Sequence, residues 1–206
     1  MPAVFPMIQV VAHYKCPFLF SEVILVINLI SRIPILQILN LSSCSIGKDG
    51  ATSICGVLHS LRYMKSLLLS RNAIPSDALA TLARTLSSRR SLQLLDLSST
   101  GAGDAGAHAL LPLLQSAGCP IELNLKDNAI GTAGAVRLLG AAAISHSLQV
   151  LDLSNNVIDD SVRYLHCCIF LRFSPSAEGC SCNTGPLFSK QRFKAHSGRK
   201  LLGQQC

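Results

Sequence analysis

A leucine that returns every 28 residues limits what this chain can fold into more than any other feature. It ends five similar segments, at Leu41, Leu69, Leu97, Leu125 and Leu153. Each segment follows the pattern LxxLxLxxN or a close variant, and no gap is needed to keep the five copies in register. Such self-similarity at a fixed period predicts an array of equivalent structural units that stack on one another.

The second half of each unit has apolar side chains three to four residues apart, which predicts a helix. Two apolar columns recur at the same period: Ile54, Leu82, Leu110 and Leu138, then Leu58, Leu86, Leu114 and Ala142. A small residue marks the start of each predicted helix: Gly50, Ala78, Gly106 and Gly134. Asp49 and Asp77 precede two of these small residues and are candidate N-terminal caps.

One strand and one helix cannot bury their apolar faces alone, so the units must stack. Parallel strands stack about 4.8 Å apart, whereas packed helices need about 10 Å. The pattern therefore predicts an α/β, right-handed solenoid shaped like a horseshoe, with parallel strands on the concave face and helices on the convex face. Asn72, Asn128 and Asn156 lie where the chain leaves a strand, and their amides can satisfy buried backbone groups. Cys44 and Thr100 occupy the same column and can do part of this work.

This combination resembles the ribonuclease-inhibitor-like leucine-rich repeats, a class that also occurs in the C-terminal regions of NOD-like receptors and in the Ran GTPase-activating protein. The resemblance covers residues 21–163 and implies a curved scaffold that holds a protein partner. We expect an N-terminal extension over residues 1–20 and a repeat domain of about five 28-residue repeats over residues 21–163. The segment Ser21 to Ser31 fits the helix of a partial leading repeat. After Arg163 the register is lost, so we expect residues 164–206 to form a degenerate, basic and largely disordered tail.

The formal charge of +7 is distributed unevenly along the sequence. Residues 36–163 carry ten basic and nine acidic side chains, whereas residues 172–206 carry six basic and one acidic. Because the excess lies in the tail, the sequence argues against a nucleic-acid partner. The longest apolar run, Val23 to Ile30, is too short to span a bilayer. No secretory signal is visible, which predicts a cytoplasmic protein with reduced thiols.

The outward positions of the strands and the turns after them are the predicted partner-binding surface on the concave face. The candidate residues are Asn40, Leu68, Arg71, Asp96, Asn124, Lys126, Asp127, Asp152 and Asn155. Aromatic anchors of the kind that dominate tight interfaces are absent from these columns, which lowers the expected affinity.

The sequence contains no convincing catalytic, cofactor or metal site. Four tail cysteines have the wrong spacing for a zinc clip: Cys167, Cys168, Cys180 and Cys182. The glycines Gly101, Gly103 and Gly106 outline GxGxxG but coincide with a turn and helix start of the repeat. We therefore predict a non-enzymatic protein–protein interaction scaffold without cofactor or small-molecule substrate. The resemblance to NOD-like receptor repeats implies that such a scaffold is used in signalling or innate-immune regulation. Two alternatives stay open: an activator of a small GTPase, and a truncated, non-functional fragment of a longer repeat protein.

Overall fold

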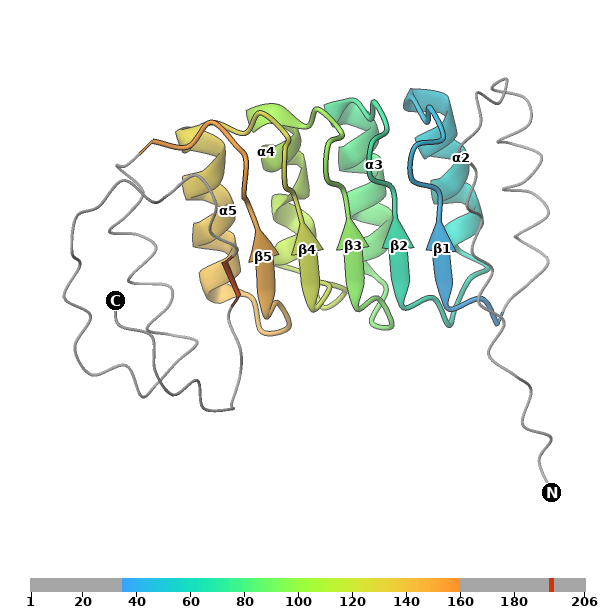
Figure 1. Ribbon diagram of the computed structural model, residues 1–206. Helices are drawn as coiled ribbons and strands as arrows, with labels where there is room; N and C mark the ends of the chain where they lie inside the picture. The colour runs from blue at the N-terminus through green and yellow to red at the C-terminus, as the bar shows by residue number, and fades with distance from the viewer. Residues whose placement is uncertain (1–34, 160–192, 195–206) are drawn as a thin grey trace, which may run out of the picture.

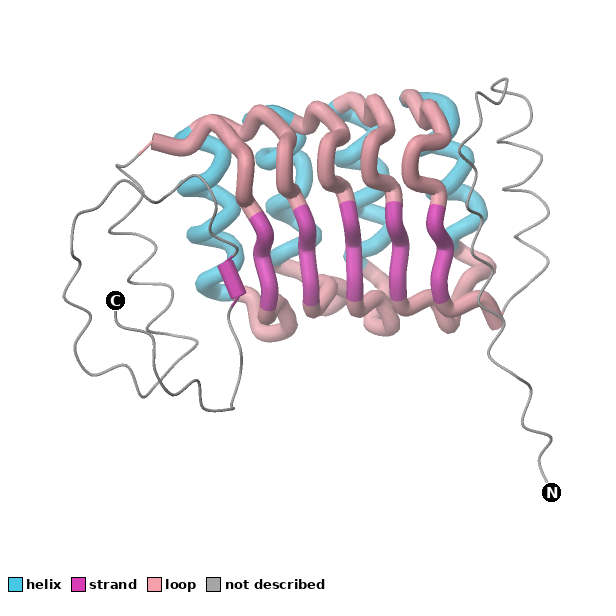
Figure 2. The backbone as a smooth tube through the Cα atoms, in the orientation of Figure 1, coloured by secondary structure: helices cyan, strands magenta, loops and turns pink. Residues whose placement is uncertain are grey.

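Strands and helices alternate along the chain in a computed structural model that describes residues 35–159 and 193–194 (Figures 1 and 2). The elements are β1 (Ile38–Asn40), α2 (Lys48–Leu58), β2 (Ser66–Leu68), α3 (Ser76–Ser87), β3 (Leu94–Asp96), α4 (Gly103–Leu114), β4 (Glu122–Asn124), α5 (Thr132–Ile144), β5 (Val150–Asp152) and β6 (Phe193–Lys194). The strands form one layer and the helices cover it from one side. The predicted α/β leucine-rich repeat solenoid is confirmed.

The 28-residue period sets the register of the sheet, because each strand residue pairs with the residue 28 positions later in the next strand. Strands β1 to β5 lie side by side in chain order, and each pairs in parallel with the next. Leu39 is opposite Leu67, and the same column continues through Leu95, Leu123 and Leu151. Each β–α–β unit therefore advances the chain by one strand, and the helices fan out more widely than the strands in Figure 1.

The repeated apolar positions form one continuous core. The strand-ending leucines and both helix columns are buried, and Leu67, Leu82 and Leu110 are each 0% exposed. Cys44 and Cys55, interpreted from the sequence as core residues, are buried as well. Burial of aliphatic side chains contributes about 1.5–3 kcal/mol each, so the stacked leucine layers are the main source of stability.

Asparagines of three repeats, Asn72, Asn128 and Asn156, connect the turns at one edge of this core. The Oδ1 atom of Asn72 accepts hydrogen bonds from the backbone N–H groups of Cys44 (3.0 Å) and Ile46 (2.9 Å) in the preceding repeat. Its Nδ2 atom donates to the carbonyls of Leu41 and Leu69, both at 2.8 Å. Asn156 repeats this arrangement. Asn128 makes the same bonds to the preceding repeat, but within its own repeat its Nδ2 atom donates to the carbonyl of Lys126 at 3.2 Å. The predicted function of the asparagine column is confirmed, and each amide also bridges two repeats.

Close packing against the neighbouring repeat explains the glycines near the starts of α4 and α5, Gly106 and Gly134. A Cβ atom at Gly106 would lie 2.7 Å from the Cβ of Ala102 and 2.9 Å from Leu79 of the neighbouring repeat. Gly134 is equally enclosed, by Asp104, Ile130 and Ala107. Larger side chains there would push neighbouring helices apart.

The prediction that Asp49 and Asp77 cap their helices is wrong. Helices α2 and α3 begin earlier, at Lys48 and Ser76, and the capping residues Gly47 and Pro75 make no side-chain cap bond. Both aspartates lie inside the first turn, where a negative charge still interacts favourably with the helix dipole. For α5 the cap comes from the neighbouring repeat, since Asp104 accepts hydrogen bonds from the N–H groups of Gly131 (2.7 Å) and Gly134 (3.2 Å).

Beyond the array, the structure describes only a short part of the tail. Phe193 and Lys194 form β6, which pairs antiparallel with β5, Lys194 opposite Val150 and Phe193 opposite Leu151. The repeat register does not predict this strand. The leading helix expected at Ser21 to Ser31 and the tail cysteines lie outside the described residues, so the predicted domain boundaries stay predictions.

The turns after the strands hold several residues in the left-handed region, which offers a matched stability test. Ala129 has φ +53° and its counterpart Gly101 has φ +71°, whereas Ala73 at the same repeat position does not have a positive φ. We expect Ala129→Gly to stabilise the protein by about 0.5–1 kcal/mol, because glycine adopts this conformation without strain. Ala73→Gly should be neutral or destabilising. Urea unfolding of the two variants measures the difference, and equal effects would contradict the explanation.

Candidate functional site

Four of the nine residues of the predicted concave surface have a structural function in the strand-ending turns. The Oδ1 atoms of Asn40, Asp96, Asn124 and Asp152 each accept a hydrogen bond, at 3.0 Å, from the backbone N–H group two residues later. Such turns are a common use of Asn and Asp. These side chains therefore fix the direction in which the chain leaves each strand, whatever else they contact.

Asp152 differs from the other members of this column. The sequence predicted an exposed side chain, but Asp152 is only 7% exposed. It lies in β5, next to the strand β6 formed by the tail. The expectation of exposure is wrong for Asp152, because the sequence register does not reveal that β5 has a second neighbour.

Leu68 is the one member of the column that cannot form such a turn. It lies on the outward side of β2, half-buried, between Asn40 of β1 and Asp96 of β3. Two further half-buried apolar residues, Ile38 and Leu94, flank Ser66 on the same face. Leu68, Ile38 and Leu94 surround Ser66, and we call them the apolar patch.

Ile38 and Leu94 were missed as candidates in the sequence, although a signal for them exists. Side chains alternate along a strand, so the residue two before each outward Asn, Asp or Leu faces the same side of the sheet. Applied at every strand, this rule adds a second outward column: Ile38, Ser66, Leu94, Glu122 and Val150. Three neighbouring strands of this array thus carry apolar side chains on a face where the core requires none.

The turn residues of the predicted surface share a left-handed conformation. Arg71, Asp127 and Asn155 have φ values of 56°, 58° and 57°, and all three side chains are exposed. The Oγ atom of Ser99 donates to Oδ2 of Asp127 at 2.8 Å, linking two turns. Lys126 is half-buried next to Asp127. Arg71 is thus an exposed cation at the sheet edge that follows the apolar patch.

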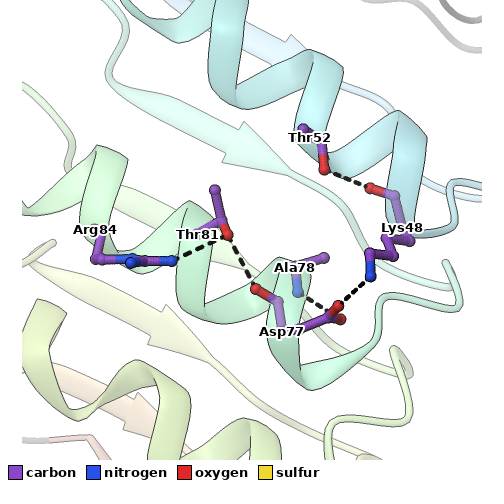
Figure 3. Close-up of polar contacts among 6 residues, drawn as sticks. All are labelled: Lys48, Thr52, Asp77, Ala78, Thr81 and Arg84. Atoms are coloured by element: carbon purple, nitrogen blue, oxygen red, sulfur yellow. Dashed lines mark hydrogen bonds and ion pairs between the residues drawn. The ribbon is translucent and has the colours of Figure 1, made fainter.

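An ion pair joins two helix starts on the other layer (Figure 3). Nζ of Lys48 in α2 lies 2.6 Å from Oδ2 of Asp77 in α3, and both side chains are more than half exposed. The pairing raises the pKa of Lys48 and lowers that of Asp77, chiefly through their mutual hydrogen bond. A further hydrogen bond from the backbone N–H of Ala78 to Oδ1 of Asp77 holds the carboxylate in place.

The pKa shifts of this pair predict its pH dependence. Because the folded-state pKa of Asp77 is lowered, its contribution is present above the usual Asp pKa and is lost as pH falls through the folded value. Because the pKa of Lys48 is raised, the contribution is also lost as pH rises through that value. We expect Asp77→Asn to reduce the acid-induced loss of stability and Lys48→Gln to reduce it by a smaller amount, because the N–H of Ala78 still lowers the pKa of Asp77. Urea unfolding from neutral pH to about pH 2 measures both effects, and no reduction with Lys48→Gln would contradict direct coupling of the two groups.

Burial makes the three described cysteine thiols weak nucleophiles. Burial raises the pKa of Cys44, Cys55 and Cys119, which disfavours the nucleophilic thiolate. Among residues 35–159 and 193–194, no group of three His, Cys, Asp or Glu side chains could hold a metal ion. None of the described helices combines the length and apolar character needed to cross a bilayer.

Comparison with known proteins agrees with the geometry. A family model described as "Leucine Rich repeat" matches residues 34–55, 121–139 and 145–161. No curated protein matches the sequence. Proteins with such repeats are generally non-catalytic modules that bind other proteins. The ribonuclease-inhibitor subtype inferred from the sequence stays a resemblance.

Solved structures that are similar to this chain include two examples. One is described as "Leiomodin-1 Actin-Binding Site 2", with 14% identity and a TM-score of 0.42, covering 77% of this chain and 74% of that one. The other is an internalin from Listeria monocytogenes, with 19% identity and a TM-score of 0.36, covering 64% of this chain and 45% of that one.

Proposed function

We propose that this chain is a protein-binding scaffold whose concave face holds a partner over the apolar patch. The observation that carries the proposal is Leu68, since neither the core nor the strand-ending turn requires a leucine there. With Ile38 and Leu94 it offers an apolar centre, and the polar turns around it provide a rim. A buried apolar centre within a polar rim is the usual anatomy of a protein interface.

The proposal is tested by photo-crosslinking in cells. A photoreactive amino acid at Ser70, on the outward face beside Leu68, should link the full chain to a discrete partner. The same amino acid at Arg84, exposed on helix α3, should not give this product. Adding Leu68→Arg to the Ser70 probe should abolish the crosslink, because it places a charge in the centre of the interface. Equal crosslinking from both positions, or an unchanged product with Leu68→Arg, would overturn the proposal.

The resemblance to NOD-like receptor repeats supports use of this scaffold in signalling or innate-immune regulation inside the cytoplasm. A second candidate function is activation of a small GTPase. Arg71 favours it, because this cation is exposed at the edge of the sheet and a free guanidinium can stabilise the charge that develops during phosphoryl transfer. GTP hydrolysis by a small GTPase should then accelerate with the chain and not with Arg71→Ala. No acceleration by the unmodified chain would remove this candidate.

A further inference from the structure

The charges of the described array separate along its axis. Residues 35–93 carry seven basic and two acidic side chains: Lys48, Arg62, Lys65, Arg71, Arg84, Arg89 and Arg90 against Asp49 and Asp77. Residues 94–159 carry two basic and six acidic side chains: Lys126 and Arg137 against Asp96, Asp104, Glu122, Asp127, Asp152 and Asp159. The basic and acidic side chains of residues 36–163 are nearly equal in number, but they are not evenly distributed. The array has a basic end, at β1 and β2, and an acidic end, at β3 to β5.

Four of the basic residues belong to two adjacent loops, and we call them the basic cluster: Arg62, Lys65, Arg89 and Arg90. These loops precede β2 and β3, at the lower edge of the sheet in Figure 1. They are joined directly, because Nη1 of Arg89 donates to the carbonyl of Leu61 at 2.7 Å. The carbonyl of Lys65 accepts the backbone N–H of Gln93 at 2.7 Å. Arg62 and Arg90 are equivalent positions of successive repeats, 28 residues apart.

No described carboxylate neutralises the basic cluster. Within residues 35–159 and 193–194 the ion pair is that of Lys48 with Asp77. Arg62, Lys65 and Arg90 are exposed, whereas Arg89 is half-buried and its pKa is lowered by burial and then by the charge of Arg62. Neighbouring cations repel one another, so an anion bound among them is stabilised more strongly than it would be beside one isolated arginine. Tyr63, 61% exposed, adds an aromatic side chain to the first of the two loops, directly after Arg62.

We infer that the basic cluster binds an acidic segment of a partner protein, with Asp or Glu side chains received by Arg62, Lys65 and Arg90. Guanidinium groups match carboxylates in geometry and can bind them through two hydrogen bonds. The aromatic ring of Tyr63 suits an apolar side chain within the same segment. The inference rests on the proposed protein-binding function and adds a second contact surface at the strand-starting edge.

The charges beside the basic cluster favour a peptide over a nucleic acid. The cluster covers two loops, whereas nucleic-acid affinity grows with the number of phosphates that a basic surface neutralises. A phosphate backbone that continued along this edge would meet the exposed Glu122 at the start of β4, and the loops over residues 115–121 and 145–149 would offer it no Lys or Arg. A short acidic segment can end before that point.

Fluorescence anisotropy of the full chain with a fluorescein-labelled peptide of glutamates around one central phenylalanine tests the inference. At low salt, Arg62→Gln with Arg90→Gln should weaken binding about tenfold or more, because both charge-assisted contacts are lost. Two matched pairs should leave it nearly unchanged: Arg84→Gln with Arg137→Gln, exposed on helices, and Arg199→Gln with Lys200→Gln in the basic tail. Circular dichroism confirms that each variant is folded.

Three results would overturn the inference: no weakening in the Arg62/Arg90 variant, equal weakening in either matched pair, or tighter binding of single-stranded RNA of the same charge with the same arginine dependence. Leu68→Arg separates this surface from the concave one. If peptide binding survives that substitution while the Ser70 crosslink is lost, each surface contributes independently. If the peptide binds and the Ser70 probe without Leu68→Arg forms no crosslink, the concave-face proposal fails and the inference about the basic cluster is retained.

Discussion

Asn128→Ala should destabilise the protein by about 3–5 kcal/mol, which is a large part of the stability of a small domain. The amide of Asn128 is 1% exposed. Its Oδ1 atom accepts from the N–H groups of Thr100 (2.9 Å) and Ala102 (3.2 Å), and its Nδ2 atom donates to the carbonyl of Leu97 at 2.8 Å. Alanine would leave these groups without a partner in a place that water does not reach.

Asn156→Ala is the matched control. Its amide makes equivalent bonds, to the N–H groups of Asn128 and Ile130 and to the carbonyls of Leu125 and Leu153. Asn156 is only partly buried, so water can replace some of the lost bonds and the destabilisation should be about half as large. Urea unfolding monitored by circular dichroism compares the two. If Asn128→Ala lowers the free energy of unfolding no more than Asn156→Ala does, the buried asparagines do not hold the repeats together.

Gly118→Ala should cost about 3 kcal/mol through a steric clash. Gly118 is buried in the loop after α4, and a Cβ atom there would collide with the backbone carbonyls of Leu86 and Ser87, the latter at 2.6 Å. Backbone atoms at the end of α3 cannot rotate away as a side chain can. The neighbouring repeats would have to separate to admit one methyl group.

The same change from glycine to alanine should have the opposite effect on stability at Gly140. Gly140 lies within α5 and is exposed, and a Cβ atom at this position would meet no other atom within 4 Å. Alanine is the better helix former, so this variant should be more stable by about 0.5–1 kcal/mol. Thermal unfolding should show a lower melting temperature for Gly118→Ala and a higher one for Gly140→Ala. Destabilisation by both substitutions would show that close packing at Gly118 does not cause its loss of stability.

The repeat made the core and the sheet predictable from the sequence, because the register of one unit fixes all the others. Leu39, Leu67 and Leu95 pair as the 28-residue period requires. Features that break the repeat could not be predicted this way. Gly118 occupies the position of Arg90 and His146 in neighbouring repeats, both exposed, and only the structure shows that the backbone of α3 closes over it.

The candidate site was predicted in outline and misjudged in detail. Alternation along the strands correctly placed Asn40, Asp96 and Asn124 on the outward face, but a sequence column does not show that these side chains already bond the next turn. The basic cluster was missed because charges were counted along the whole array. The grouping depends on two loops that are 28 residues apart and meet through Arg89 and Leu61.

Native-state hydrogen exchange of the full chain tests the central claim, that the chain folds into a stacked array able to present a binding face. We predict strong protection of the backbone N–H groups that connect neighbouring repeats, including those of Leu41, Leu69, Leu97 and Leu125, and of Cys44 and Thr100, which donate to the asparagines. Uniformly fast exchange of these amides would contradict the account and favour the alternative of a non-functional fragment.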